Sequence, residues 1–169
     1  MVRARKGVTL MELMIVAGIV STLFAVAAPI LLQANRQFIM VRTKIELQQE
    51  ARGIMYVLTR SLRQAQKDTI VISCVANQPY YSKIQFDTEQ SSTTAVSNTR
   101  VFQQEGTVLY QLIGANKRVL SRNLSYLAFT FPRSDDMSML SVSITLRKSI
   151  YQGRTKALHM ASEKVHIMN

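Results

Sequence analysis

Hydrophobic and polar positions follow three different patterns along the chain, and the first is an uninterrupted apolar run. From Leu13 to Leu32 no residue is charged, and the only polar side chains are Ser21 and Thr22. At about 1.5 Å of rise per residue, about twenty helical residues reach ~30 Å, the thickness of the hydrocarbon layer of a membrane. The pattern therefore predicts a helix that can span a bilayer.

The second pattern, over residues 33–67, has the period of an amphipathic helix. The segment contains no proline and a single glycine, Gly53. Apolar residues recur at spacings of three and four, which we expect to form a stripe packed on the chain's own sheet. They are Leu47, Ala51, Ile54, Leu58, Leu62 and Ala65, with Phe38, Val41 and Ile45 extending the stripe upstream.

The opposite face of the same segment is basic. Its charged residues are Arg36, Arg42, Lys44, Arg52, Arg60, Arg63 and Lys67. A basic helix face is typical of membrane or nucleic-acid binding, but it is more commonly a solvated surface. We interpret it as a solvated face.

The third pattern begins after Asp68, where apolar residues recur with a period of two. Within 100–114 we expect two strands joined at Glu105 and Gly106. Strands are predicted over 69–75, 80–88, 100–114, 124–131, 139–149 and 156–168. The predicted fold is therefore α+β: one long N-terminal helix, membrane-spanning in its first half, packed on one face of a C-terminal antiparallel β-sheet.

Basic residues precede the apolar run and set its expected orientation. Arg3, Arg5 and Lys6 supply three charges of the net +11, and the rest of the excess is spread along the chain. By the positive-inside rule this end stays cytoplasmic and the C-terminal part crosses the membrane. A cleaved secretory signal is the competing explanation, but the apolar run exceeds the usual ~7 to 15 residues of such a signal.

One carboxylate, Glu12, stands at the beginning of the apolar run. A carboxylate inside the hydrocarbon layer costs roughly 2.5 to 3.5 kcal/mol even on lenient insertion scales. Either Glu12 has a partner there, or it lies near the interface, where the cost is much smaller, and has no role of its own. The charge alone does not decide between these two explanations.

The residues around Glu12 carry a resemblance to a known family. The stretch KGVTLMEL, after a short basic leader, resembles the processing site of type IV pilins and type II secretion pseudopilins. The resemblance implies that a prepilin peptidase cuts between Gly7 and Val8, and that Val8 is then N-methylated. Thr9 and Glu12 take the second and fifth positions of the mature chain, and Pro29 falls where the family commonly has a helix-kinking proline.

The same resemblance gives Glu12 a role and divides the chain. In a filament of parallel helices, Glu12 of one subunit would face the free amine of Val8 on its neighbour, and Thr9 lies beside this contact. Such an ion pair is little screened in a dry helical core. The implied division is a leader over 1–7, a transmembrane and filament-core helix over 8–32, an amphipathic continuation over 33–67 and a β-rich globular part over 68–169.

A looser resemblance covers residues 50–169. The stretches LTRSLRQA and LSRNLSYLAFTF resemble parts of the J-type minor pseudopilins and the W-type minor type IV pilins. This implies a minor subunit that helps initiate or cap a type II secretion pseudopilus or a type IV pilus. Its expected partners are the prepilin peptidase and other major and minor pilins or pseudopilins. It would be a single-pass inner-membrane protein with an extracytoplasmic globular part, and later filament-associated.

No group of residues indicates catalysis or metal binding. His159 and His166 are seven residues apart, which places them on opposite faces of a strand. Asp135 and Asp136 are typical of a turn, although calcium binding there stays open. Cys74 is expected to be a small buried residue of a strand. We therefore expect no enzyme activity, no cofactor, no metal and no small-molecule substrate.

Two alternative functions remain. A signal-anchored envelope protein would keep its leader and act as a binding module in the membrane. A DNA-capturing competence filament is suggested by the basic helix face and by Arg147, Lys148, Arg154 and Lys156, although nucleic acid is the less favoured partner. The residue at the mature N-terminus separates the first alternative from a filament subunit, and a steep salt dependence would mark DNA binding.

Overall fold

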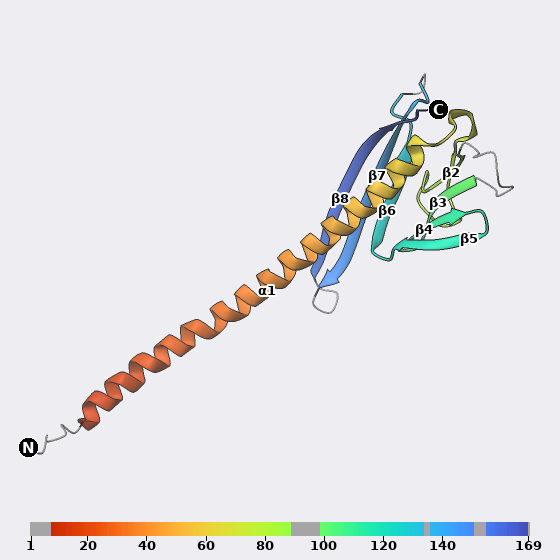
Figure 1. The fold of residues 1–169 in the computed structure, drawn as a ribbon. Coiled ribbons are helices and arrows are strands. Elements are labelled where there is room, and N and C mark those ends of the chain that lie inside the picture. Colours follow the sequence, from red (N-terminus) through yellow and green to blue (C-terminus); the bar gives the residue numbers. More distant parts are fainter. Residues whose placement is uncertain (1–7, 89–98, 134–135, 151–154, 169) are drawn as a thin grey trace, which may run out of the picture. The chain divides into compact units, whose positions relative to one another are not determined.

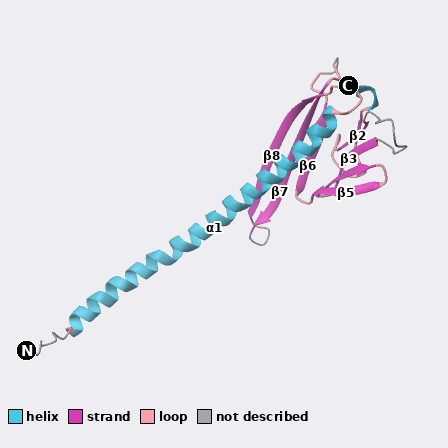
Figure 2. Cartoon of the chain, viewed as in Figure 1, coloured by secondary structure: helices cyan, strands magenta, loops and turns pink. Residues whose placement is uncertain are grey.

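The computed structural model describes residues 8–88, 99–133, 136–150 and 155–168. Along these residues one long helix is followed by a short 3₁₀ helix and strands β1 to β8 (Figure 1). Figure 2 separates the helical from the strand segments by colour. The chain forms two compact units, Met1–Val41 and Arg42–Asn169, and the boundary between them falls inside the long helix.

The first unit holds the beginning of helix α1 (Leu10–Arg63). Its sequence is rich in Leu, Ala and Met, which favour helix, and the helix continues through Pro29. Every side chain from Val8 to Phe38 is exposed, including the whole apolar run. A helix that is apolar on all sides is expected in a membrane or inside a larger assembly, so this segment carries surface that its own chain does not cover.

In the second unit, α1 buries one face against the strands. The predicted stripe is confirmed, because Leu47, Ala51, Leu58 and Leu62 are all 0% exposed. The proposed upstream extension of the stripe is wrong, since Phe38, Val41 and Ile45 are 66%, 56% and 49% exposed. The helix ends at Arg63, and the short 3₁₀ helix η1 (Lys67–Thr69) follows it.

The α+β fold is confirmed, but the strands form two antiparallel sheets where we predicted one. The first sheet has the order β1-β2-β3-β4-β5 and the second the order β6-β7-β8. The first comprises β1 (Val71–Ser73), β2 (Lys83–Asp87), β3 (Thr99–Glu105), β4 (Val108–Ile113) and β5 (Asn116–Ser121). The second comprises β6 (Leu124–Thr130), β7 (Met139–Ile150) and β8 (Thr155–His166). Strand β5 was not expected as a separate element.

The inner faces of both sheets and the buried face of α1 form one core. Phe86 of β2 and Phe102 of β3 stack with ring centroids 6.1 Å apart. From the second sheet, Phe129 and the inward residues of β7 are fully buried. Polar contacts also join the helix to the strands: Arg100 Nη1 donates to Ser61 Oγ at 3.2 Å, Asn123 Nδ2 donates to Glu50 Oε2 at 2.9 Å, and Lys148 Nζ donates to Glu46 Oε2 at 2.9 Å.

Two local predictions have opposite outcomes. The turn expected at Glu105 and Gly106 is confirmed, because β3 ends at Glu105 and β4 begins at Val108. Gly106 has φ +61°, a left-handed conformation that glycine adopts without strain. Cys74 was expected to be buried in a strand, but it is exposed and follows the end of β1.

Candidate functional site at the start of helix α1

Thr9 caps the first turn of helix α1. Its Oγ1 accepts a hydrogen bond from the backbone N–H of Glu12 at 3.3 Å, and its carbonyl accepts one from the N–H of Leu13 at 3.2 Å. Thr9 therefore satisfies one of the helix's free N–H groups, as an N-cap residue does. The spacing Thr-x-x-Glu is that of a capping box, a signal that our sequence reasoning overlooked.

Glu12 lies in the first turn of α1, three residues after the cap. A carboxylate at this place is stabilised by the positive end of the helix dipole. Its side chain is exposed, and it makes no ion pair with any residue that the structure describes. The structure thus places Glu12 in the first turn of the helix, with a charge that no described residue neutralises.

The predicted cleavage site lies directly before this cap. Val8 is 70% exposed and precedes Thr9, whereas Gly7 lies outside the described residues. Val8 and Glu12 are four residues apart, which is about one helical turn. The backbone on the C-terminal side of the predicted cut is therefore accessible, and the first hydrogen bonds of the helix come after it.

The polar residues of the apolar run are satisfied within the helix itself. Ser21 Oγ donates to the carbonyl of Ala17 at 2.7 Å, and Thr22 Oγ1 donates to the carbonyl of Ile19 at 2.8 Å. In the described part of the chain, α1 is the one helix long and apolar enough to cross a membrane, a test that signal sequences also pass. The helix is compatible with a membrane anchor.

Pro29 lies inside α1, and helix continues on both sides of it. Because proline has no N–H, the carbonyl of Ala25 loses its usual donor four residues along. The missing hydrogen bond weakens the helix locally, which agrees with the kink that the resemblance implies at Pro29. The kink stays a prediction.

The other residues considered for chemistry lie apart from this site. His159 is half-buried and His166 exposed, as expected for opposite faces of β8. Asp136 accepts a hydrogen bond from the Ser138 N–H at 2.8 Å, and hydrogen bonds from Ser138 lower the pKa of the Asp136 carboxyl. Asp135 lies outside the described residues. Within the described ranges, no three His, Cys, Asp or Glu side chains are grouped as a metal site would need.

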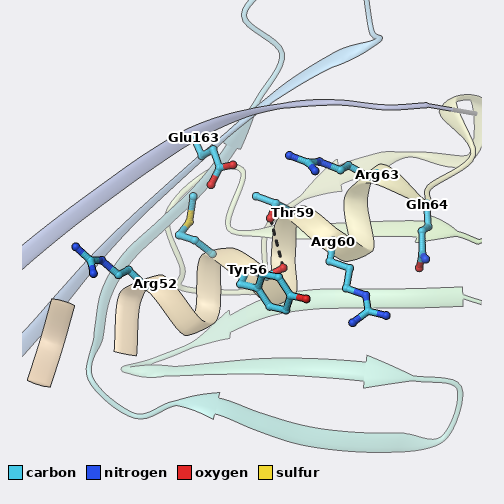
Figure 3. Close-up of a pocket in the computed structure, with 8 residues that line it drawn as sticks. Arg52, Tyr56, Thr59, Arg60, Arg63, Gln64 and Glu163 are labelled. Atoms are coloured by element: carbon cyan, nitrogen blue, oxygen red, sulfur yellow. Dashed lines mark hydrogen bonds between the residues drawn. The ribbon is translucent and has the colours of Figure 1, made fainter. Parts of the chain in front are cut away.

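One feature of the second unit was missed by sequence reasoning. A hollow of about 640 Å³ lies along α1 and is lined by Arg52, Met55, Tyr56, Thr59, Arg60, Arg63, Gln64 and, from β8, Glu163 (Figure 3). The arginines were noted as a basic face, but their place beside a strand could not be read from helical spacing. The hollow can be found only from the tertiary structure, because Glu163 belongs to a strand that is distant from α1 in the sequence.

Comparisons with known proteins give no family for this chain, so any functional assignment depends on the residues at the start of α1. The local geometry consists of a helix cap at Thr9, an unpaired carboxylate at Glu12 and an exposed apolar helix after them. No protein-family model, no curated protein and no solved structure matches the chain.

Proposed function

We propose that the chain is a minor pilin or pseudopilin subunit without catalytic activity. It is stored in the inner membrane through residues 8–32, is cut by a prepilin peptidase between Gly7 and Val8, and then helps initiate or cap a filament. The proposal combines the resemblance of KGVTLMEL to prepilin processing sites with a helix whose apolar side chains are all exposed from its start at Leu10 to Phe38.

The cap at Thr9 is the observation that carries the proposal. A cut between Gly7 and Val8 leaves Thr9 in place, so the hydrogen bond from the Glu12 N–H to Thr9 Oγ1 survives processing. The mature chain would begin with one free residue followed by a helix that is already capped. Removal of the leader therefore leaves the two hydrogen bonds at Thr9 intact, as expected for a subunit that functions after cleavage.

Glu12 has a role that fits this arrangement. Cleavage creates a positive amine on Val8, and Glu12 is a negative charge without an ion-pair partner among the described residues of its own chain. A carboxylate entering an apolar layer alone is unfavourable, whereas one that meets an amine is compensated. We propose that Glu12 of one subunit pairs with the Val8 amine of its neighbour and so aligns an incoming subunit.

The mass of the membrane-extracted protein tests the proposal. The expected species lacks residues 1–7 and carries one methyl group on Val8. Gly7→Leu should leave the full-length chain, because a bulky residue blocks the cut. Gly18→Leu is the matched control, since no atom lies within 4 Å of a Cβ placed there, and it should be processed normally.

A signal-anchored envelope protein is the second candidate. It is favoured by the same exposed apolar helix and by the self-satisfied hydroxyls of Ser21 and Thr22. Such an anchor has no need of the Thr9 cap beside a cleavage point and keeps its leader. An unprocessed, membrane-resident wild-type chain would contradict the filament proposal and support the anchor.

A further inference from the structure

The two sheets cover helix α1 unevenly in the second unit. On one flank, Glu50 receives a hydrogen bond from Asn123, and Ser61 receives one from Arg100. The opposite flank borders the hollow of about 640 Å³, whose other wall includes Glu163 of β8 (Figure 3). The helix is thus packed on one side and open on the other.

The open flank of α1 carries three arginines and the partly apolar side chain of Tyr56. Arg52, Tyr56 and Arg60 follow one another at spacings of four, and Arg63 lies three residues further on, so all four lie on neighbouring turns. Tyr56 is 64% exposed. The three arginines make no ion pair with any residue in the described ranges, so their positive charge is available to a partner.

The strand beside this flank has a free edge. In the sheet order β6-β7-β8, strand β8 is terminal and pairs with β7 over its full length, from Thr155 to His166. No backbone hydrogen bond within the described residues reaches its other edge. An unpaired edge presents alternating N–H and C=O groups, which can pair with a further extended chain.

The dimensions of the helix flank and of an added strand agree. From Arg52 to Arg63 the helix rises about 16 Å, and about five extended residues cover the same distance. Alternate side chains of a strand point to the same face. An added strand would therefore direct every second side chain toward the arginines.

We propose that the groove between α1 and β8 binds an extended acidic segment of another protein, which adds to β8 as a fourth strand. Carboxylates at alternating positions of that segment pair with Arg52, Arg60 and Arg63, and its apolar atoms cover Tyr56. The inference is separate from the filament proposal, because all of its residues belong to the second unit and none takes part in processing.

Charge and geometry favour this occupant over two others. A second copy of the chain is disfavoured, because 21 Lys and Arg against 10 Asp and Glu make the copies repel. A nucleic acid would be attracted by the arginines of the hollow, but it cannot pair with the β8 backbone. An acidic polypeptide can pair with the arginines of α1 through its carboxylates and with the free edge of β8 through its backbone, so it contacts both walls of the groove.

Binding to defined peptides tests the proposal with the full chain in non-ionic detergent micelles. The probe is a fluorescent peptide of eight residues with blocked ends and alternating aspartate and valine. Its controls are the same composition with the aspartates in one block, and a peptide of alternating lysine and valine. We expect the alternating acidic peptide to bind about tenfold more tightly than the block control, and the lysine peptide not to bind.

Matched variants connect this binding to the groove. The triple variant Arg52→Gln, Arg60→Gln, Arg63→Gln should bind the acidic peptide about tenfold more weakly. Arg118→Gln, Arg122→Gln, Arg147→Gln removes the same charge from other exposed positions and should bind as the wild type does. Both variants should keep the wild-type unfolding midpoint, since all six side chains are unpaired in the described structure. Hydrogen exchange at alternate amides of β8 should slow when the acidic peptide binds.

Four results would overturn the proposal. They are absent binding of the alternating peptide, equal binding of the block control, equal losses in the two triple variants, and unchanged exchange in β8. A single-stranded oligothymidylate that displaces the peptide and binds more tightly, without protecting β8, would instead identify a nucleic-acid site.

Discussion

The two halves of helix α1 have the same backbone structure but opposite surroundings. From Leu10 to Val41 it is apolar along most of its length, and its side chains are almost all exposed. From Arg42 to Arg63 it buries a narrow stripe against the chain's own strands. An exposed apolar surface of the first kind marks a site for membrane or protein contact. The first half therefore presents surface for a membrane or a protein partner, and the second half builds the chain's own core.

The carboxylates of the helix show the same contrast. Glu46 lies 2.9 Å from Lys148 Nζ and 3.4 Å from Arg42 Nε, and Glu50 accepts a hydrogen bond from Asn123. Glu12 has no ion-pair partner in the described residues. The second half compensates these two carboxylates within the chain, whereas the described residues give Glu12 no such compensation. This difference supports the proposal that Glu12 contacts a neighbouring subunit.

Replacing one leucine in each half should give the largest difference in stability. Leu58 is 0% exposed and Leu23 is 64% exposed. Leu58→Ala should lower the free energy of unfolding by about 2 to 5 kcal/mol, because it leaves a cavity. Leu23→Ala should change it by less than about 0.5 kcal/mol. Denaturant unfolding of the full chain in micelles, followed by tyrosine near-UV circular dichroism, measures both. Equal losses would contradict the division between the halves.

Charge removal at Glu12 should affect assembly without affecting the fold. We expect Glu12→Gln to keep the wild-type unfolding midpoint and to reduce the amount of the chain recovered in filaments by about tenfold, because in the proposed filament the Val8 amine of the neighbouring subunit would be left unpaired. Glu50→Gln is the matched control in the second half, where the hydrogen bond from Asn123 lies within one chain. Glu50→Gln should enter filaments in proportion to the amount of folded protein in the cell.

The same variant separates two roles of Glu12. Glutamine can replace glutamate in a capping box, but it carries no charge. Normal incorporation of Glu12→Gln together with defective Glu12→Ala would assign the residue to the start of the helix. Normal incorporation of both would remove Glu12 from assembly altogether.

Sequence periodicity predicted the helix and most strands because each depends on local spacing. The stripe from Leu47 to Leu62 was found because spacings of three and four reveal the face that a helix buries. The predicted extension of the buried stripe to Phe38 and Ile45 was wrong for a related reason. Periodicity finds an apolar face, but it does not show where the strands that cover that face end.

The division into two sheets could not be predicted in the same way. Residues of β4 and of the first part of β7 alternate between buried and half-buried positions in the same manner, so a period of two does not reveal which strands pair. The break lies between Ser121 and Leu124. Strand β5 was missed because four of its six residues, Asn116 to Val119, are exposed, which gives little apolar alternation.

The candidate site was only partly predictable. Gly7, Val8, Thr9 and Glu12 were found through a resemblance, and the physical signal for the cap, Thr-x-x-Glu, was present in the sequence but was not used. The arginine groove combines one helix flank with Glu163, which lies about a hundred residues later along the chain. Nothing local in the sequence indicates that these two segments meet.

The smallest expected effect concerns the paired carboxylate Glu46 in the second half. A hydrogen bond from Lys148 and the charge of Lys148 lower the pKa of Glu46 from its ordinary value of 4.5, and Arg42 adds to this. Because the folded pKa is depressed, the stabilisation is present above the unfolded pKa and is lost as the pH falls through the folded value. The loss should therefore begin below pH 4.5.

Lys148→Met should reduce the stability at about pH 7 slightly and should flatten its decline on acidification, because the main cause of the depressed pKa is removed. Arg42→Met is the matched control and should flatten the decline less, since its charge is a lesser cause. Unfolding midpoints at about pH 7 and about pH 3 measure the effect, and high salt should weaken it. Parallel pH profiles for the wild type and Lys148→Met would mean that this ion pair adds no stability. The contrast between the halves would then rest on the buried stripe alone.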